Sequence, residues 1–120
     1  MSELGYLRRL FAYDDWANRE VTRLLEAASE PPPRSVRLLG HIAGAEWTWY
    51  GRIAGKSAGV AVWPEIGVRE FDGHWERLRQ AWAALLDAPR LDETVAYTNS
   101  RGQSFVSVRR THLALEAGLC

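Results

Sequence analysis

The sequence has little that would mark an extracellular, membrane-bound or nucleic-acid-binding protein. Its only cysteine among 120 residues is Cys120, so no internal disulfide can form. Fifteen basic residues balance fifteen acidic ones, which leaves no net field toward nucleic acid or an anionic membrane. No apolar run approaches the roughly 20 residues of a bilayer span, and no secretory leader precedes the first expected helix. We therefore expect a cytoplasmic protein that binds neither nucleic acid nor membrane.

Several common catalytic motifs are missing as well. The sequence contains no phosphate-binding glycine loop, no nucleophile elbow, no Cys-x-x-Cys pair and no Rossmann fingerprint, so enzymes built on these motifs are not expected. With 47% hydrophobic and 25% charged residues, the composition is that of an ordinary globular protein. The length allows one hydrophobic core, and we expect a single domain over residues 1–120.

Tryptophan, by contrast, is abundant. Six of them in so short a chain suit thick helix interfaces or a pocket wall, because each indole buries a large area and has one N–H that needs a partner. They are Trp16, Trp47, Trp49, Trp63, Trp75 and Trp82.

Apolar spacing of three and four residues predicts a long first helix from Ser2 to about Ala28. Its apolar face is predicted to contain Leu4, Leu7, Phe11, Val21, Leu24, Leu25 and Ala28. Its apolar face is broken at Asp14 and Asn18, which indicates polar groups that point inward. The prolines at 31–33 end this helix, and Ser35 begins a second one that fades near Gly55. The second apolar face is predicted to contain Leu38, Ile42, Ala45, Trp49 and Ile53, with His41 beside it.

The rest of the chain alternates between connections and helices. Glycines and a proline over 55–67 predict a long connection that shapes a pocket mouth, and a third helix follows over 68–88. The buried face of this helix is predicted to contain Phe71, Trp75, Leu78, Trp82, Leu85 and Leu86. Residues 94–105 are β-prone around a turn sequence, which indicates a small β-hairpin or an extended crossover. A last, short helix begins near Ser107. The predicted fold class is an all-α four-helix bundle with long crossover connections.

The last expected helix, of about 14 residues, is roughly half the length of the first and cannot cover the same axial span. Part of the bundle is then expected to be missing, which would leave an apolar groove. A second copy of the chain could fill such a groove, so we expect a homodimer.

Few residues could carry chemistry. His112, Glu116 and Cys120 recur every four residues, so a helix presents them on one side, as a metal site in a helix bundle requires. Chance and core packing also produce such spacing. A single histidine on an apolar face, such as His41, is more often a hydrogen-bonded core residue than a ligand, and His74 is expected at the surface.

Two segments, Phe11–Asn18 (FAYDDWAN) and His41–Trp49 (HIAGAEWTW), together resemble the DinB-like family of bacterial metal-binding four-helix bundles. The later pattern Val95-x-Tyr97-x-Asn99-x-x-Gly102, followed by a helix that contains a histidine, is similar to that family in order and spacing. The resemblance extends over nearly the whole chain.

The resemblance implies a divalent metal, commonly nickel or zinc, held by three histidines, of which the first corresponds to His41. The last helix departs from the family pattern, because Glu116 and Cys120 stand where the other two histidines are expected. Glutamate and cysteine are both competent zinc ligands, so the metal-site hypothesis is His41, Glu116 and Cys120. The expected surroundings of the metal or pocket are Asp14, Asn18, His112 and Trp49.

Two functions remain open at this point. The first is a metal-dependent hydrolase or thiol-dependent transferase that acts on a small thiol, as the resemblance implies. The second is a metal-free helical bundle that dimerises or binds a partner. An altered or truncated last helix that has lost the metal site is equally compatible with the sequence.

Overall fold

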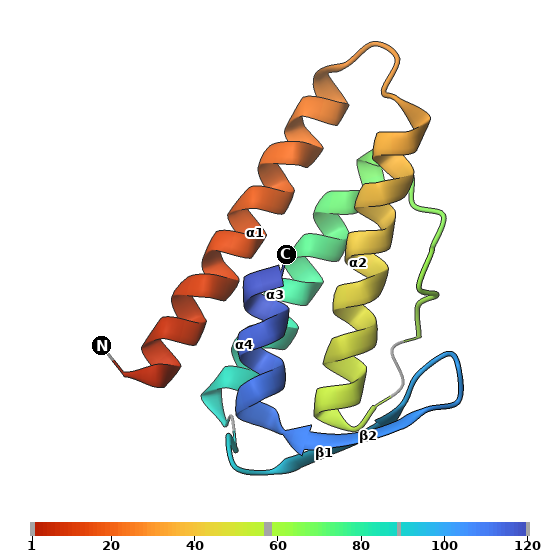
Figure 1. Ribbon diagram of the computed structural model, residues 1–120. Helices are drawn as coiled ribbons and strands as arrows, with labels where there is room; N and C mark the ends of the chain where they lie inside the picture. Colours follow the sequence, from red (N-terminus) through yellow and green to blue (C-terminus); the bar gives the residue numbers. More distant parts are fainter. Residues whose placement is uncertain (1, 57–58, 89, 120) are drawn as a thin grey trace.

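The computed structural model describes residues 2–56, 59–88 and 90–119. Figure 1 shows the elements in chain order. They are α1 (Glu3–Ala27), α2 (Pro33–Ala54), the 3-10 turn η1 (Val68–Glu70), α3 (Phe71–Asp87), β1 (Thr94–Thr98), β2 (Ser104–Val108) and α4 (Arg109–Leu119).

Helix α1 begins where the side chain of Ser2 accepts a hydrogen bond of 3.0 Å from the Gly5 N–H, as the sequence predicts. The prediction that Asp14 and Asn18 point inward is confirmed. The apolar face that the sequence predicts for the second half of the helix is only partly confirmed: Leu25 is buried, but Val21 and Leu24 are 44% and 73% exposed. The residues that are buried still follow the three- and four-residue spacing of one helix face; they are Leu7, Phe11, Asp14, Asn18, Thr22 and Leu25.

Helix α2 begins at Pro33, two residues before Ser35, because proline is well suited to the first turn of a helix. Its buried face is also rotated from the predicted one: Leu38 is 46% exposed, and Glu46 is buried. The cause is the connection that follows. A Cβ atom at Gly44 would lie 2.6 Å from the carbonyl oxygens of both Ala61 and Val62, so this backbone packs directly on the glycine.

Helix α3 confirms the predicted apolar face, since Phe71, Trp75, Leu78 and Trp82 are all less than 4% exposed. The histidine expected at the surface, His74, is instead partly buried and accepts a hydrogen bond from the Trp47 indole at 3.2 Å.

The small β-hairpin is present. Strands β1 and β2 pair antiparallel, with Thr94 opposite Val108 and Thr98 opposite Ser104. The side-chain oxygen of Asn99 accepts hydrogen bonds of 2.9 Å from the backbone N–H groups of both Arg101 and Gln103, and Gly102 supplies the positive φ of 77°. The all-α class predicted from the sequence is therefore wrong, because a two-stranded sheet is part of a mostly helical fold.

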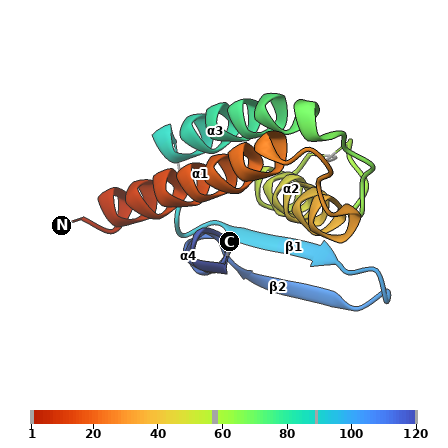
Figure 2. The same ribbon diagram turned by 90° about the horizontal axis from the view of Figure 1, so that it is seen from above.

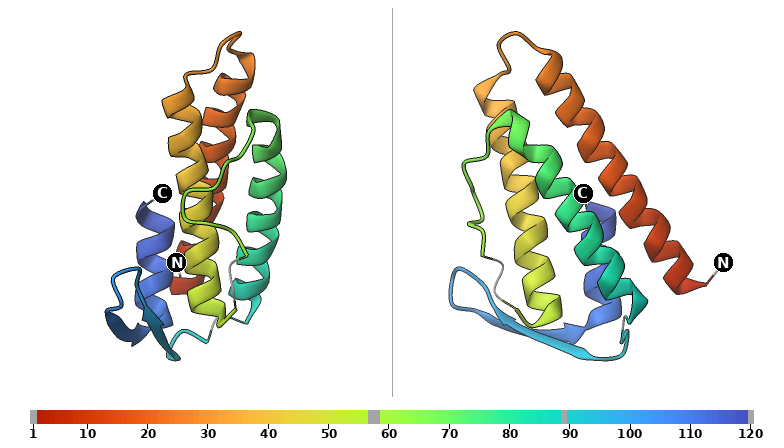
Figure 3. Two further views of the ribbon diagram at one scale, coloured as in Figure 1. Left: turned by 90° about the vertical axis from the view of Figure 1, so that its right-hand side faces the viewer. Right: turned by 180° about the vertical axis from the view of Figure 1, so that it is seen from behind.

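Figure 2 shows three layers: α3 lies on one side of α1 and α2, while α4 and the hairpin lie on the other. The two views of Figure 3 show that α4 runs beside only part of the longer helices. Helix α4 has 11 residues against 25 in α1, so its axis is less than half as long. The Cα atoms span 47 × 38 × 18 Å, which is a flat body. A regular four-helix bundle is therefore not what the structure shows.

No helix in the described part of the chain is long and apolar enough to cross a bilayer. The cytoplasmic location expected from the sequence stays a prediction.

Candidate ligand-binding site

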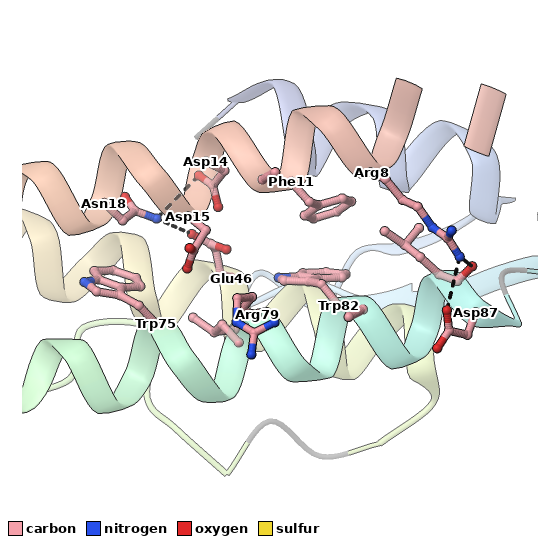
Figure 4. Close-up of a pocket in the computed structure, with 14 residues that line it drawn as sticks. Arg8, Phe11, Asp14, Asp15, Asn18, Glu46, Trp75, Arg79, Trp82 and Asp87 are labelled. Atoms are coloured by element: carbon pink, nitrogen blue, oxygen red, sulfur yellow. Dashed lines mark hydrogen bonds and ion pairs between the residues drawn. The ribbon is translucent and has the colours of Figure 1, made fainter. Parts of the chain in front are cut away.

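A cavity of about 380 Å³ lies between α1 and α3, with Glu46 of α2 contributing to its lining (Figure 4). Small-molecule sites in proteins begin at roughly 300 Å³ and combine apolar walls with a few polar groups. The cavity has this make-up. Its apolar lining consists of Phe11, Ala12, Trp75, Leu78, Trp82, Ala83 and Leu86, and its polar lining of Arg8, Asp14, Asp15, Asn18, Glu46, Arg79 and Asp87.

Three buried polar side chains form one end of the cavity. Asp14, Asn18 and Glu46 are 4%, 6% and 2% exposed. The Asn18 amide joins the two acids, because its nitrogen donates to Glu46 Oε2 at 3.0 Å and to Asp14 Oδ1 at 3.4 Å (Figure 4). The inward-facing Asn18 of α1 is thus hydrogen-bonded to Glu46 of α2, and this contact links the two helices.

The buried carboxyls influence each other's charge. Burial raises the pKa of Glu46 well above its ordinary value, and the neighbouring Asp14 and Glu116 raise this pKa further, because a second negative charge nearby is unfavourable. The hydrogen bond from Asn18 acts in the opposite direction and is the weaker effect. Glu46 therefore keeps its proton to a higher pH than an exposed glutamate does.

The two buried indoles of α3 differ in their hydrogen bonding. Trp75 donates its N–H to Thr22 Oγ1 at 2.7 Å, and this hydroxyl in turn donates to the carbonyl oxygen of Asn18 at 2.8 Å. Trp82 is 3% exposed, and within the described residues its N–H has no acceptor. Figure 4 shows the Trp82 nitrogen pointing along the cavity toward the acidic end. Trp82 therefore combines a side chain that lines the cavity with a buried N–H that has no described acceptor.

Ion pairs on the protein surface border the cavity. Arg8 contacts Asp87 at 3.1 Å, and Arg19 contacts Asp15 at 3.0 Å within α1 and Glu76 of α3 at 3.1 Å. These side chains are partly exposed, so solvent screening keeps the contribution of each pair to stability small. Their role here is to hold α1 and α3 in position on both sides of the opening.

His41 lies away from this cavity, beside the connection that follows α2. Its Nδ1 lies 2.8 Å from the carbonyl oxygen of Val62, which can only accept, so Nδ1 carries the proton. The ring stacks on Trp63 with centroids 3.8 Å apart.

Of the three predicted metal ligands, Cys120 lies outside the described residues. Glu116 is buried on α4, and its charge raises the pKa of Glu46. The metal-site hypothesis stays a prediction. Among the side chains that the structure describes, no group of three or more His, Cys, Asp or Glu is placed to hold a metal ion. We therefore derive no metal-dependent step.

The four residues expected around the site separate into two pairs. Asp14 and Asn18 line the cavity, whereas His112 and Trp49 meet near the hairpin with ring centroids 5.2 Å apart. His112 also forms a hydrogen bond with Ser107. Burial lowers the pKa of His112, and the nearby Arg52 guanidinium lowers it further.

Sequence reasoning missed Glu46 and the distinct role of Trp82. A signal for Glu46 was present, because Leu39, Ala43, Glu46 and Ile53 follow the same three- and four-residue steps as a buried helix face. No local signal separates Trp82 from Trp75, because the difference depends on the presence of Thr22 on another helix.

The chain was compared with protein-family models, with curated proteins and with solved structures, and none of them matches. The resemblance to the DinB-like family thus stays a prediction from the motifs. The class of protein that the fold and the cavity define is a mostly helical protein with a small two-stranded antiparallel sheet and a candidate small-molecule site.

Proposed function

We propose that this protein binds a small organic molecule in the cavity between α1 and α3. The observation that supports this function best is the Trp82 side chain, which lines a cavity of about 380 Å³ and has a buried N–H without an acceptor among the described residues. A buried donor without a partner is rare in proteins and costs about 1–3 kcal/mol, which an accepting ligand group would recover.

Filling the cavity tests the proposal. Ala83 and its neighbour Ala84 are both exposed, but only Ala83 is part of the cavity lining, so Ala83→Leu and Ala84→Leu form a matched pair. Fragment screening by ligand-observed NMR should give hits that Ala83→Leu weakens at least tenfold and Ala84→Leu leaves unchanged. A screen whose hits are indifferent to Ala83→Leu would rule out binding in this cavity.

A divalent-metal function, as a hydrolase or thiol-dependent transferase, is a second proposal. It is supported by the hydrogen bond from His41 Nδ1 to a backbone carbonyl, because this bond leaves the lone pair of the neutral ring on Nε2, the arrangement common in metal-binding histidines. Elemental analysis of protein purified without chelator should then show nickel or zinc, and His41→Ala should lose it. Unmutated protein without metal removes this proposal.

Homodimerisation is proposed as well, and it would suit the partner-binding alternative. Tyr13 and Trp16 on α1 are 63% and 54% exposed, with ring centroids 5.6 Å apart. Exposed aromatic pairs are typical of contact surfaces. Sedimentation equilibrium should show a dimer that Trp16→Glu dissociates, whereas the exposed Arg9→Glu in the same helix should leave it intact. A monomer at high concentration contradicts the proposal.

A further inference from the structure

A hydrogen bond between two aromatic side chains joins α2 to α3. The indole N–H of Trp47 on α2 donates to Nδ1 of His74 on α3 at 3.2 Å. Trp47 also packs edge-on against Tyr50 with ring centroids 6.1 Å apart, and Tyr50 packs edge-on against Trp82 of the cavity wall at 5.5 Å. The bond is thus part of the packing that holds α2 against the helix that forms one wall of the cavity.

The direction of this bond fixes the protonation state of the histidine. An indole nitrogen can only donate, so Nδ1 of His74 must keep its lone pair, and the neutral ring then carries its proton on Nε2. A protonated imidazole has an N–H at both nitrogens and accepts no hydrogen bond. Protonation of His74 would set two N–H groups against each other, so the bond to Trp47 exists only while the ring is neutral.

The surroundings of His74 favour its neutral state. The side chain is partly buried, and burial lowers its pKa below the ordinary value of about 6.5. The guanidinium of Arg77 on α3 lowers this pKa further, whereas the carboxylate of Glu70 in η1 acts in the opposite direction and is the weaker effect. From α2 the ring faces the uncharged indole of Trp47. His74 therefore gains its proton at a lower pH than an exposed histidine does.

We propose that the bond between Trp47 and His74 is a pH-sensitive contact between α2 and α3, which is present while His74 is neutral and is lost when the ring takes up a proton. The proton binds at Nδ1, the atom that accepts from the indole, and no other chemical change is required. This inference does not depend on the proposed ligand site.

The contact makes folding depend on pH in one direction. Because the pKa of His74 is lower in the folded chain than in the unfolded chain, the unfolded chain binds the proton more readily. The contribution of His74 to stability is therefore complete above about pH 6.5 and is lost as the pH falls through the folded pKa. A single proton changes the equilibrium constant of unfolding by at most about tenfold per pH unit.

Proton–nitrogen correlation NMR tests the contact at the indole itself. Each of the six tryptophans gives one indole N–H signal, and Trp47→Phe identifies the signal of Trp47 by its loss. Between about pH 8 and pH 5 this signal should move upfield as the hydrogen bond is lost. Its midpoint should equal that of the imidazole C–H signal of His74, and at the upper end Nδ1 should be the unprotonated ring nitrogen.

The matched control is His74→Asn, because the side-chain oxygen of asparagine can accept in the place of Nδ1 and does not titrate. In this variant the Trp47 signal should stay fixed over the same pH range. Urea unfolding adds a second readout. The equilibrium constant of unfolding of the wild type, divided by that of His74→Asn, should rise as the pH falls below about 6.5.

Each of the following results would overturn the inference. If Nδ1 carries the proton at pH 8, His74 cannot accept from the indole. If the Trp47 signal stays fixed while His74 titrates, or moves equally in His74→Asn, the indole does not respond to this histidine. If His74 remains neutral down to pH 5, or the ratio of unfolding constants stays constant, the contact is not sensitive to pH.

Discussion

The two buried tryptophans of α3 allow the value of one hydrogen bond to be measured within a single helix. Trp75 and Trp82 are 1% and 3% exposed, and both line the cavity. Only Trp75 has a described acceptor, the hydroxyl of Thr22. Replacing each by phenylalanine removes the same atoms from similar surroundings, so the loss of apolar contact and the void left behind largely cancel in the comparison.

What does not cancel is the hydrogen bond. Trp75→Phe loses a buried bond whose net contribution is about 1 kcal/mol, whereas Trp82→Phe removes a donor whose burial without a partner costs about 1–3 kcal/mol. Trp75→Phe should therefore be the more destabilising by about 2–4 kcal/mol. With an unfolding entropy of about 2 cal/mol/K per residue, a chain of this length shifts its Tm by about 4 °C per kcal/mol, so the two midpoints should differ by about 8–16 °C.

Urea unfolding followed by far-UV circular dichroism measures the free energies directly, and an unchanged m value in both variants shows that the comparison is valid. A further control is Thr22→Val, which removes the acceptor and keeps the side-chain shape. It should destabilise the wild-type protein more than it destabilises Trp75→Phe. The reasoning is refuted if Trp82→Phe costs as much as Trp75→Phe, because the Trp82 N–H would then have an equivalent partner.

Two further predictions concern the buried acid and the packed glycine. Because the folded state raises the pKa of Glu46, its contribution to stability is largest below the pKa of the unfolded chain and is lost as the pH rises through the folded pKa. The free energy of unfolding of Glu46→Gln, measured by urea unfolding between pH 5 and 8.5, should therefore increase relative to that of the wild type as the pH rises, by at most about 1.4 kcal/mol per pH unit. A constant difference between the two proteins contradicts the raised pKa of Glu46. Gly44→Ala should destabilise by about 1–3 kcal/mol, because its Cβ would meet two carbonyl oxygens at 2.6 Å. In the control Gly73→Ala, the new Cβ would contact only the flexible end of Arg77, at 3.2 Å, so the free energy of unfolding should increase by about 0.5–1 kcal/mol through helix propensity in the same assay. Equal effects of the two substitutions would show that the connection after α2 does not pack tightly on Gly44.

The sequence determined those features that depend on neighbouring residues along the chain. Helical spacing placed α3 and its buried face, the cap at Ser2 placed the start of α1, and Asn99 with Gly102 specified the hairpin turn. The break in apolar spacing also identified Asp14 and Asn18 as inward-facing. Each of these signals is local, because it acts through backbone geometry within a few residues.

Tertiary structure alone decided which face of α2 is buried, which acids lie close together and which indole has no acceptor among the described residues. Glycines have no hydropathy signal, so the packing of residues 61–64 on Gly40 and Gly44 could not be read from apolar spacing. The contact between Asn18 and Glu46 joins residues 28 positions apart, and that between Trp75 and Thr22 joins residues 53 apart. The candidate site depends on such long-range contacts, because a cavity is formed by the packing of separate helices and no single segment contains it.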